Sequence, residues 1–555
     1  MKSSWFWKEA DGHKRPTALL EWGLVLLSVL LLWAGWPGRG WPGLLFLAFT
    51  PLLALAEYLY NGGYRRPGRR LMGRVYLALL LWNLICTGWV GFATLPGMLA
   101  MVAINALLML IPWRLYAWFK KVKPQRALLI GLLAWISLEY LHMHWELAWP
   151  WLNLGFGFGN YPGWVQWYDY TGILGGTLWI LLANGAFYMV FWRHGAILQG
   201  QVRWLSLTYA LLFVIGLPLL LSIWRGNAFE AEGKPVEVVL VQPNEDPYSN
   251  ILISHPEKVG LLAKTDQLVS LTDSLITQNT RWVLWPESAL PGFVWEYNPA
   301  GNQTLQTLYH WQSQYPNLEV VVGATTGTLV TDTTASRPTI RQRRSTNERY
   351  EAHNSAIWLS HGRAPEFYHK SVLVPAIETL PFASVLGPIV GPILESAGGV
   401  ASGFAPQDSA EVFWTKDSLA LAPSVCYESI FGDHTREFVN KGAQAIGVIT
   451  NDAWWAESPG HRQHFAYARL LAVSLRRPVL RAANTGISGF IDAHGRVKQK
   501  TVFYTETALR DTMIFSEYKS VYAQRGDILG TTAAWLLVAL LASALVQRST
   551  QRHKA

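Results

Sequence analysis

The sequence predicts a membrane-spanning α-helical protein that also carries an α/β domain of layered sheets. Hydrophobic residues make up 51% of the 555-residue chain and charged residues only 15%, which is too apolar for an ordinary soluble protein. Tryptophan occurs 29 times, and the indole ring favours the boundary between lipid and water. Long apolar runs fill the first part and the end of the chain, whereas short β-branched runs alternate with polar stretches between them.

Eight apolar stretches approach the length of about 20 residues that a helix needs to cross the hydrocarbon core. They are Leu19–Trp36, Leu44–Tyr60, Val75–Gly91, Met98–Trp113, Ala127–Leu141, Thr171–Phe191, Trp204–Trp224 and Ile528–Val546. The first is expected to be retained and not cleaved as a signal peptide, because no small-residue cleavage site follows it. The predicted domains are a seven-span transmembrane domain at 1–224, a soluble domain at 225–526, and an eighth span with a tail at 527–555.

Positive charge falls in every second connection between these stretches. Basic residues precede the first span and follow the second, fourth, sixth and eighth. Because Lys and Arg favour cytoplasmic loops, both termini are expected in the cytoplasm of a bacterial cell. The soluble domain, which joins the seventh span to the eighth, is then expected on the periplasmic side of the inner membrane. The net charge of +9 is accounted for by these loops, so nucleic-acid binding is not expected.

The middle of the chain predicts a sheet that is covered on both faces. Strand-like runs include VEVVLVQPN, RWVLWPES, LEVVVGATT, NSAIWLS, LALAPSVCYES, AIGVITND and SGFIDAHG. Several of them are apolar throughout, which is typical of strands in a layered sandwich. The polar insert Thr328–Arg349 is expected to be a solvated loop. The segment Glu378–Gly399 is rich in Pro, Gly and large apolar residues, so it either folds into the core or forms a lid at the bilayer surface.

Three residues with acid, base or nucleophilic chemistry each lie beside an apolar run. Glu287 follows VLWP, Lys370 lies in FYHKSVLVP and Cys426 in LAPSVCYES. Strand ends are where α/β folds place working groups. Taken one at a time, the three have ordinary explanations as a solvated carboxylate, a surface charge and a small buried residue.

The remaining cysteine and two histidines are assigned no chemistry. Cys86 lies in an apolar run and is expected to be a packed small residue, so no disulfide framework is predicted. His461 and His464 share a helix face by their spacing, but without an evident carboxylate partner they are expected to be structural. No H-E-x-x-H, P-loop or G-x-S-x-G motif occurs, and neither a metal nor a cofactor is predicted.

In this order, the three residues resemble the catalytic glutamate, lysine and cysteine of the nitrilase, or carbon-nitrogen hydrolase, superfamily. WPESALP, YHKSVLVPAIE, SVCYESIF and the long stretch from NDAWWAESPG to FIDAHGRV are similar to its membrane branch, the apolipoprotein N-acyltransferases. The segment PWLNLG at Pro150 to Gly155 agrees with that family too. The resemblance implies a nitrilase-like α-β-β-α sandwich outside the cytoplasm.

The resemblance also implies roles for individual residues. Cys426 would be the nucleophile, Glu287 the base that takes its proton, and Lys370 the positive charge at the oxyanion. The implied supporting residues are Glu378 and Glu428, which would orient Lys370, and Tyr427, which would flank the acyl pocket. The acyl donor would be a membrane phospholipid. The acceptor would be the α-amino group of the diacylglyceryl-cysteine that begins an apolipoprotein, and the enzyme is expected to be a monomer.

Some positions depart from the family pattern. Where the family typically reads K-x-H-L-V-P-F-G-E, this chain has Val372, Ala376 and Ile377 in place of the His, the Phe and the Gly. Ile251 stands where the family usually has a tryptophan near the acyl site. These changes leave the reaction type in place, but they bear on the preferred acyl chain or headgroup.

Two other functions fit parts of the sequence. A membrane-tethered amidase would use the same three residues with water as the acceptor in place of an amine. A transporter or lipoprotein-handling module with an inactive nitrilase-like domain would need charges along its spans. Glu57 and Glu139 are candidates for such charges, but they lie toward span ends.

Overall fold

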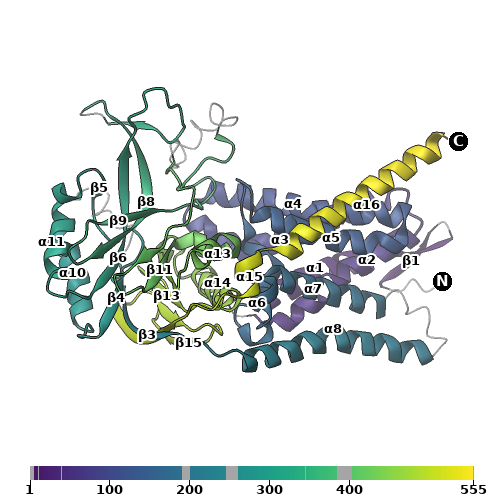
Figure 1. Ribbon diagram of the computed structural model, residues 1–555. Helices are drawn as coiled ribbons and strands as arrows, with labels where there is room; N and C mark the ends of the chain where they lie inside the picture. Colours follow the sequence, from purple (N-terminus) through teal and green to yellow (C-terminus); the bar gives the residue numbers. More distant parts are fainter. Residues whose placement is uncertain are drawn as a thin grey trace. The chain divides into compact units, whose positions relative to one another are not determined.

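The computed structural model describes residues 5–10, 12–38, 40–190, 201–245, 261–343, 346–383 and 403–553. The chain forms two compact units (Figure 1). The helical unit comprises residues 1–145, 149–228 and 527–555, and the α/β unit comprises residues 146–148 and 229–526.

The helical unit begins with a short antiparallel hairpin and continues as long apolar helices. The hairpin strands are β1 (Trp7–Ala10) and β2 (His13–Pro16). The helices are α1 (Ala18–Gly35), α2 (Thr50–Asn61), α3 (Pro67–Thr87), α4 (Leu95–Val122), α5 (Ala127–His142), α6 (Tyr168–Thr171), α7 (Leu174–Tyr188), α8 (Gln201–Ala228) and α16 (Ile528–His553).

Among the described residues, six helical segments are long and apolar enough to cross a membrane. They contain or overlap six of the predicted spans: α1, α2 with the turn before it, α3, α4, α8 and α16. The two other predicted spans coincide with the shorter apolar helices α5 and α7. The structure therefore supports a protein with several apolar helices, and the predicted number of eight spans stays a prediction.

Buried polar side chains hold the ends of these helices. Asn184 of α7 accepts hydrogen bonds through Oδ1 from the backbone N–H groups of Phe49 and Thr50, at 2.7 and 3.1 Å, where α2 begins. The first N–H groups of a helix have no partner within it, so this amide satisfies donors that lipid would leave unpaired. Glu139 of α5 accepts from the N–H of Leu154 at 2.8 Å and thereby anchors the irregular segment that contains PWLNLG.

The α/β unit contains two mixed sheets. The larger has the order β16-β3-β4-β6-β8-β7, with β5 added to β6 and β9 to β8. Its strands are β3 (Lys234–Gln242), β4 (Thr280–Leu284), β5 (Phe293–Trp295), β6 (Glu319–Leu329), β7 (Arg341–Gln342), β8 (Arg349–Ser360), β9 (Glu366–His369) and β16 (Thr507–Phe515). The smaller sheet runs in order through β10 (Phe413–Trp414), β11 (Ala420–Val425), β12 (Ala445–Thr450), β13 (Val479–Ala483), β14 (Gly489–Ile491) and β15 (Val497–Lys500).

Helices cover the outer face of each sheet, and the two sheets pack against each other. Helices α10 (Leu261–Asp273) and α11 (Gln303–Gln312) cover the larger sheet, and α13 (Gly432–Asn440) and α14 (Pro459–Leu475) cover the smaller one (Figure 1). A short helix, α15 (Val521–Arg525), precedes α16. This arrangement is the α-β-β-α sandwich that the resemblance implied.

Alternation along the strands explains the two buried faces of the larger sheet. In β4, Val283 belongs to the core with α10 and α11, whereas Trp282 points to the other face. There Trp282 stacks on Trp358 of β8 at 6.3 Å between ring centroids, and Trp358 stacks on Phe413 of the smaller sheet at 5.5 Å. Because successive side chains point to opposite faces, a strand buried on both sides reads as apolar throughout, as the sequence indicated.

Candidate active site

The three residues singled out from the sequence lie where strands of the α/β unit end, and their side chains meet. Glu287 follows β4 by three residues, Lys370 directly follows β9, and Cys426 directly follows β11. Strands β4 and β9 belong to the larger sheet and β11 to the smaller one. The group is therefore built across the packed pair of sheets, and each member is buried.

Glu287 is held by two hydrogen bonds that leave little freedom to its carboxylate. Its Oε1 accepts from the amide of Asn354 at 2.7 Å, and its Oε2 accepts from the backbone N–H of Asn451 at 2.9 Å. Burial raises the pKa of Glu287 above its usual range, and the charge of Lys370 offsets that effect in part. The carboxyl group is thus a better proton acceptor than a solvated glutamate.

Close packing against β6 sets the path of the Glu287 backbone. A Cβ added to Gly323 would lie 2.5 Å from Cα of Glu287 and 2.6 Å from the carbonyl oxygen of Pro286. Only a residue without a side chain allows this approach, because real Cβ atoms do not come so near to backbone atoms.

Lys370 is a buried cation between two carboxylates. Only 1% of the residue is exposed; its Nζ donates to Oε1 of Glu378 at 2.9 Å and lies 3.6 Å from Oε1 of Glu287. Burial by itself lowers the pKa of Lys370, but the nearby charges of Glu378 and Glu287 outweigh it and raise the pKa. The ammonium group therefore stays charged at neutral pH.

Cys426 occupies a strained turn and carries a protonated thiol. Its φ of +53° lies in the left-handed region, which is uncommon for a residue with a side chain. Burial, followed by the negative charge of Glu287, raises the pKa of the Cys426 thiol, and the charge of Lys370 opposes this only in part. The thiol lies within electrostatic reach of both Glu287 and Lys370. The thiol thus needs a base to become a nucleophile, and the nearby Glu287 carboxylate can act as that base.

Glu428, an expected supporting residue, ties the cysteine turn to the lysine loop. It is fully buried; its Oε2 accepts from the N–H of Val425 at 2.8 Å. Its Oε1 accepts from the N–H groups of Ser371 and Val372, at 2.5 and 3.1 Å. Glu428 thus contacts the backbone just after Lys370, whereas Glu378 contacts the ammonium group itself.

Tyr427 is buried beside the nucleophile. Its hydroxyl donates to the carbonyl oxygen of Ala148 at 2.9 Å, and its ring packs edge-on against Phe431. Ala148 belongs to the three residues 146–148 that group with the α/β unit.

Asn354 is a site residue for which the sequence analysis assigned no role. Its side-chain Nδ2 donates to Glu287 at 2.7 Å and to Glu378 at 3.1 Å, so one amide bridges the two carboxylates beside Lys370. Its backbone carbonyl oxygen accepts from the N–H of Lys370 at 2.8 Å. The only sequence signal was a polar residue at the head of the run NSAIWLS.

The expectation that His464 lacks a carboxylate partner is wrong. Its Nδ1 lies 3.1 Å from Oδ1 of Asp452, because the chain after β12 turns back toward α14. His461 lies on the same helix, stacks on Phe503 at 4.1 Å, and has a pKa lowered to about 4, chiefly by burial. The sequence could not reveal the His464 pair, since twelve residues and a turn separate its members.

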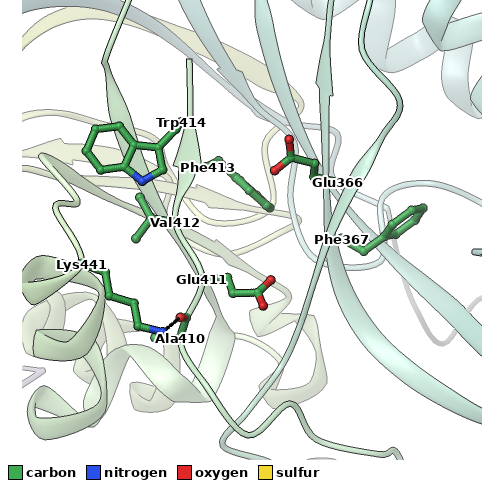
Figure 2. A pocket seen from close by; sticks show the side chains of 8 residues that line it. All are labelled: Glu366, Phe367, Ala410, Glu411, Val412, Phe413, Trp414 and Lys441. Atoms are coloured by element: carbon green, nitrogen blue, oxygen red, sulfur yellow. Dashed lines mark hydrogen bonds between the residues drawn. The ribbon is translucent and has the colours of Figure 1, made fainter. Parts of the chain in front are cut away.

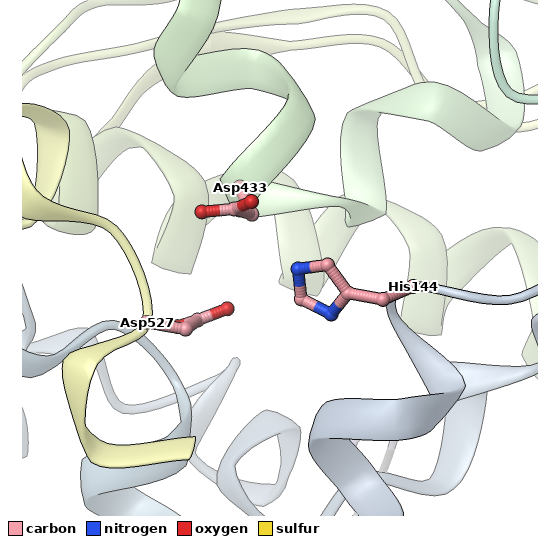
Figure 3. A group of neighbouring side chains, drawn as sticks. All are labelled: His144, Asp433 and Asp527. Carbon is pink, nitrogen blue, oxygen red and sulfur yellow. The ribbon is translucent and has the colours of Figure 1, made fainter. Parts of the chain in front are cut away.

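Two further groups of side chains lie apart from these residues. A pocket of about 300 Å³ is lined by Glu366, Phe367, Ala410, Glu411, Val412, Phe413, Trp414 and Lys441 (Figure 2). Figure 3 draws His144, Asp433 and Asp527, whose side chains are of types that bind metals. His144 and Asp527 belong to the helical unit and Asp433 to the α/β unit, so no site is assigned to them. Within its own unit, Asp433 pairs with Arg436 at 2.6 Å.

Some sequence-based expectations lie outside the described residues. Ile251 is one of them, and so is the segment Glu378–Gly399 beyond position 383. The other departures from the family pattern are described. Val372 donates its N–H to Glu428. Ala376, with a φ of +63°, and Ile377 are exposed and directly precede Glu378.

Comparison with known proteins gives matches over most of the chain. The family model described as the apolipoprotein N-acyltransferase N-terminal domain matches residues 28–186, and the one described as carbon-nitrogen hydrolase matches residues 251–515. Apolipoprotein N-acyltransferase of Chlorobaculum tepidum is 28% identical over 519 residues, which cover 91% of this chain and 93% of the relative. The protein of the same name from Geobacter metallireducens is 27% identical over 552 residues, 96% of each chain. Among solved structures, Nit3 of Saccharomyces cerevisiae, a member of branch 10 of the nitrilase superfamily, is 15% identical, with a TM-score of 0.33 over 54% of this chain and 95% of that chain.

Proposed function

Because the chain belongs to the apolipoprotein N-acyltransferase family, we propose that it moves a fatty acyl chain from a membrane phospholipid to an apolipoprotein. The acceptor is the α-amino group of the N-terminal diacylglyceryl-cysteine. One observation carries the assignment of the site: a buried thiol, a carboxylate with a raised pKa and a buried ammonium group meet at the ends of three strands.

In the first half-reaction, Cys426 attacks the ester carbonyl of the phospholipid. Glu287 takes the thiol proton, and a base so placed contributes about 10² to 10⁴ in rate. The carbonyl oxygen becomes an oxyanion that the Lys370 ammonium group and a backbone N–H stabilise. When the tetrahedral intermediate collapses, Glu287 returns the proton to the leaving glycerol oxygen. The products are a lysophospholipid and a thioester on Cys426.

In the second half-reaction, the neutral α-amino group of the apolipoprotein attacks the thioester. An α-amino group has a pKa of about 7.7 to 8.0, so losing its proton costs little near neutral pH. Glu287 accepts a proton from the attacking nitrogen and delivers it to the departing sulfur. The exchange of ester for thioester is nearly balanced and the formation of the amide is favourable, so the sequence of steps proceeds without ATP.

Glu378, Asn354 and Glu428 are proposed as positioning residues. Glu378 keeps Lys370 charged, and Asn354 bridges the two carboxylates by donating to both. Glu428 fixes the backbone on both sides of the site through the N–H groups of Val425 and Ser371. Tyr427 is proposed to flank the acyl chain.

The proposed organisation places this chemistry outside the cytoplasm. The domains are a seven-span membrane domain at 1–224, a catalytic domain at 225–526 and an eighth span with a cytoplasmic tail at 527–555. Basic residues in alternate connections support an orientation with both termini in the cytoplasm and the catalytic domain on the periplasmic side of the inner membrane. The enzyme is proposed to act as a monomer.

A transporter with an inactive domain is a weaker alternative. Such a protein needs charged groups free to mark a path through its spans. Glu57 is instead bonded to Lys120 and to the hydroxyl of Tyr188. Glu139 accepts from the indole N–H of Trp135 at 2.8 Å as well as from Leu154. These contacts are those of structural anchors.

Exposure of the detergent-solubilised protein to phospholipid, without acceptor, tests the proposal. We expect release of one equivalent of lysophospholipid and an intact-mass increase of one acyl group, which peptide mapping locates on Cys426. The chain has one other cysteine, so Cys86→Ala is the matched control that keeps the reaction, and Cys426→Ala abolishes it. A protein that ignores phospholipid but hydrolyses a soluble amide is an amidase, and that result would overturn the proposal.

A further inference from the structure

A group of fully buried charges lies behind Cys426, outside the chemistry proposed above. Asp452, His464 and Arg481 have no exposed surface. Oδ2 of Asp452 pairs with Nη2 of Arg481 at 2.6 Å, and the same arginine nitrogen lies 3.0 Å from Nδ1 of His464. Burying ionisable groups is costly unless each is paired, and here each of the three has a partner within the group.

The group reaches the nucleophile through one serine. Nε2 of His464 lies 3.0 Å from Oγ of Ser429, and that hydroxyl donates to the backbone carbonyl oxygen of Cys426 at 2.7 Å. Ser429 is buried in the short 3₁₀ turn Cys426–Ile430 that begins at the nucleophile. A continuous chain of contacts therefore runs from Arg481 to the carbonyl group of Cys426.

When His464 is neutral, the donor Arg481 and the acceptor carbonyl of Cys426 set the direction of each hydrogen bond on the path between them. An arginine N–H only donates, so Nδ1 of His464 accepts from Arg481. A carbonyl oxygen only accepts, so the single proton of Ser429 points to Cys426. Oγ of Ser429 then accepts from His464, which must carry its proton on Nε2. If the imidazole gains a second proton, Nδ1–H donates to Asp452 and no longer accepts from Arg481, while the bonds from Nε2–H to Ser429 and from Ser429 to Cys426 are unchanged.

Holding this carbonyl also fixes the N–H on the other side of the same peptide bond. The peptide unit between Cys426 and Tyr427 is planar, so the direction of its C=O sets the direction of its N–H. Cys426 has a left-handed φ, a strained conformation that persists only where the surroundings impose it. A hydrogen bond to the carbonyl oxygen also polarises the peptide and strengthens its N–H as a donor.

We propose that His464 and Ser429 form a positioning relay that aims the N–H of the Cys426–Tyr427 peptide unit at the oxyanion during acyl transfer. This inference rests on the proposed function, in which a backbone N–H works with Lys370. Neither residue touches the substrate. They act through the peptide bond that they hold. Arg481, which is paired with Asp452, donates to Nδ1 of His464 and so keeps the proton of the neutral imidazole on Nε2.

The test compares two reactions of the same thiol. Attack on a phospholipid ester forms an oxyanion, whereas alkylation by iodoacetamide does not, although both require Glu287 to take the proton. Removing an oxyanion donor costs about 10² to 10³ in rate, so a donor that is only misdirected should cost about tenfold or more. We expect Ser429→Ala to slow acylation of Cys426 by at least about tenfold and to change alkylation less than about twofold.

Matched variants complete the experiment. Ser474→Ala removes a buried hydroxyl that also donates to a backbone carbonyl, that of Leu470 at 2.9 Å, on the helix that carries His464. It should leave both rates unchanged. Glu287→Gln should lower both. If Ser429→Ala acylates at the wild-type rate, or loses acylation and alkylation equally, the relay is refuted while the proposed function stands. If the wild-type protein releases no lysophospholipid, the proposed function fails.

Discussion

At the scale of single residues, Asn354 controls the charge balance around Lys370. Its amide donates to Glu287 and Glu378, which favours ionised carboxylates. Asn354→Asp replaces that donor by a third negative charge, so the pKa of Glu287, already raised by burial, should rise further. Because the base works when ionised, the acidic limb of the acylation pH profile should move to higher pH.

The rate of lysophospholipid release, measured at a series of pH values, gives this shift. Asn440→Asp, at the exposed end of α13, adds the same charge away from the site and is the control. An acidic limb at the same pH in wild type and Asn354→Asp would show that Asn354 does not tune the base.

Glu428 makes a second residue-scale prediction, which concerns stability. Burial favours its neutral form, but the hydrogen bond and charge of His434 and the N–H of Val425 outweigh burial and lower its pKa. A lowered pKa stabilises the folded protein above the ordinary glutamate value of about 4.3, and this contribution is lost as the pH falls through the folded value. In Glu428→Gln, the NH₂ group takes the place of one carboxylate oxygen and faces backbone N–H groups whose hydrogen bonds it cannot accept. This should lower the free energy of unfolding by about 1 to 3 kcal/mol at pH 7.

Thermal unfolding in detergent at several pH values tests this prediction. The difference in melting temperature between wild type and Glu428→Gln should be largest near neutral pH and should shrink below about pH 4. Glu437→Gln, an exposed position on α13, should show no such trend. If the difference in melting temperature between the two proteins stays constant with pH, the charge of the Glu428 carboxylate contributes nothing to the stability of the fold.

At the scale of secondary-structure elements, the contact between β6 and the Glu287 loop is a sensitive point. In Gly323→Ala the new Cβ must displace backbone atoms of residues 286–288, since it would lie 2.5 to 2.7 Å from them. A shift of about 1 Å in a catalytic group can cost about 10²-fold in rate. We expect a loss of acylation of that order with the fold retained, measured as single-turnover lysophospholipid release.

Gly447→Ala in β12 separates this effect from general crowding. Its Cβ would meet the side chains of Leu284 and Leu421 at 3.0 and 3.1 Å, and no backbone atom is among its nearest neighbours. It should lower the melting temperature more than the rate. Equal losses of rate in the two variants would show that Gly323 has no special relation to Glu287.

The sequence predicted the strands and the residues at their ends, but not the contacts between distant segments. Apolar runs such as VLWP and LAPSV predicted strands, and the proposed catalytic residues Glu287 and Cys426 lie just beyond them. In α/β folds the ends of neighbouring strands meet at one edge, where side chains can gather into a site. Asn354 escaped notice because it sits inside β8, where a polar residue has no distinctive neighbour pattern. The Asp452–His464 pair escaped for a related reason: contacts between segments that are distant in the chain depend on how the layers pack.

At the scale of the whole molecule, the charge pattern of the connections makes the last prediction. Basic loops resist transfer across the membrane, so the loop after α4 should stay in the cytoplasm and the α/β unit should face the other side. We expect a membrane-impermeant maleimide to label Lys416→Cys, in the α/β unit, in intact spheroplasts. Lys121→Cys, in the last turn of α4, should be labelled only once the membrane is opened. Both positions are exposed, whereas the native Cys86 and Cys426 are buried, so background labelling should be low. Labelling of Lys121→Cys in intact spheroplasts would indicate the opposite orientation. The Cys426 thiol would then lie on the other side of the membrane from an acceptor displayed outside the cytoplasm.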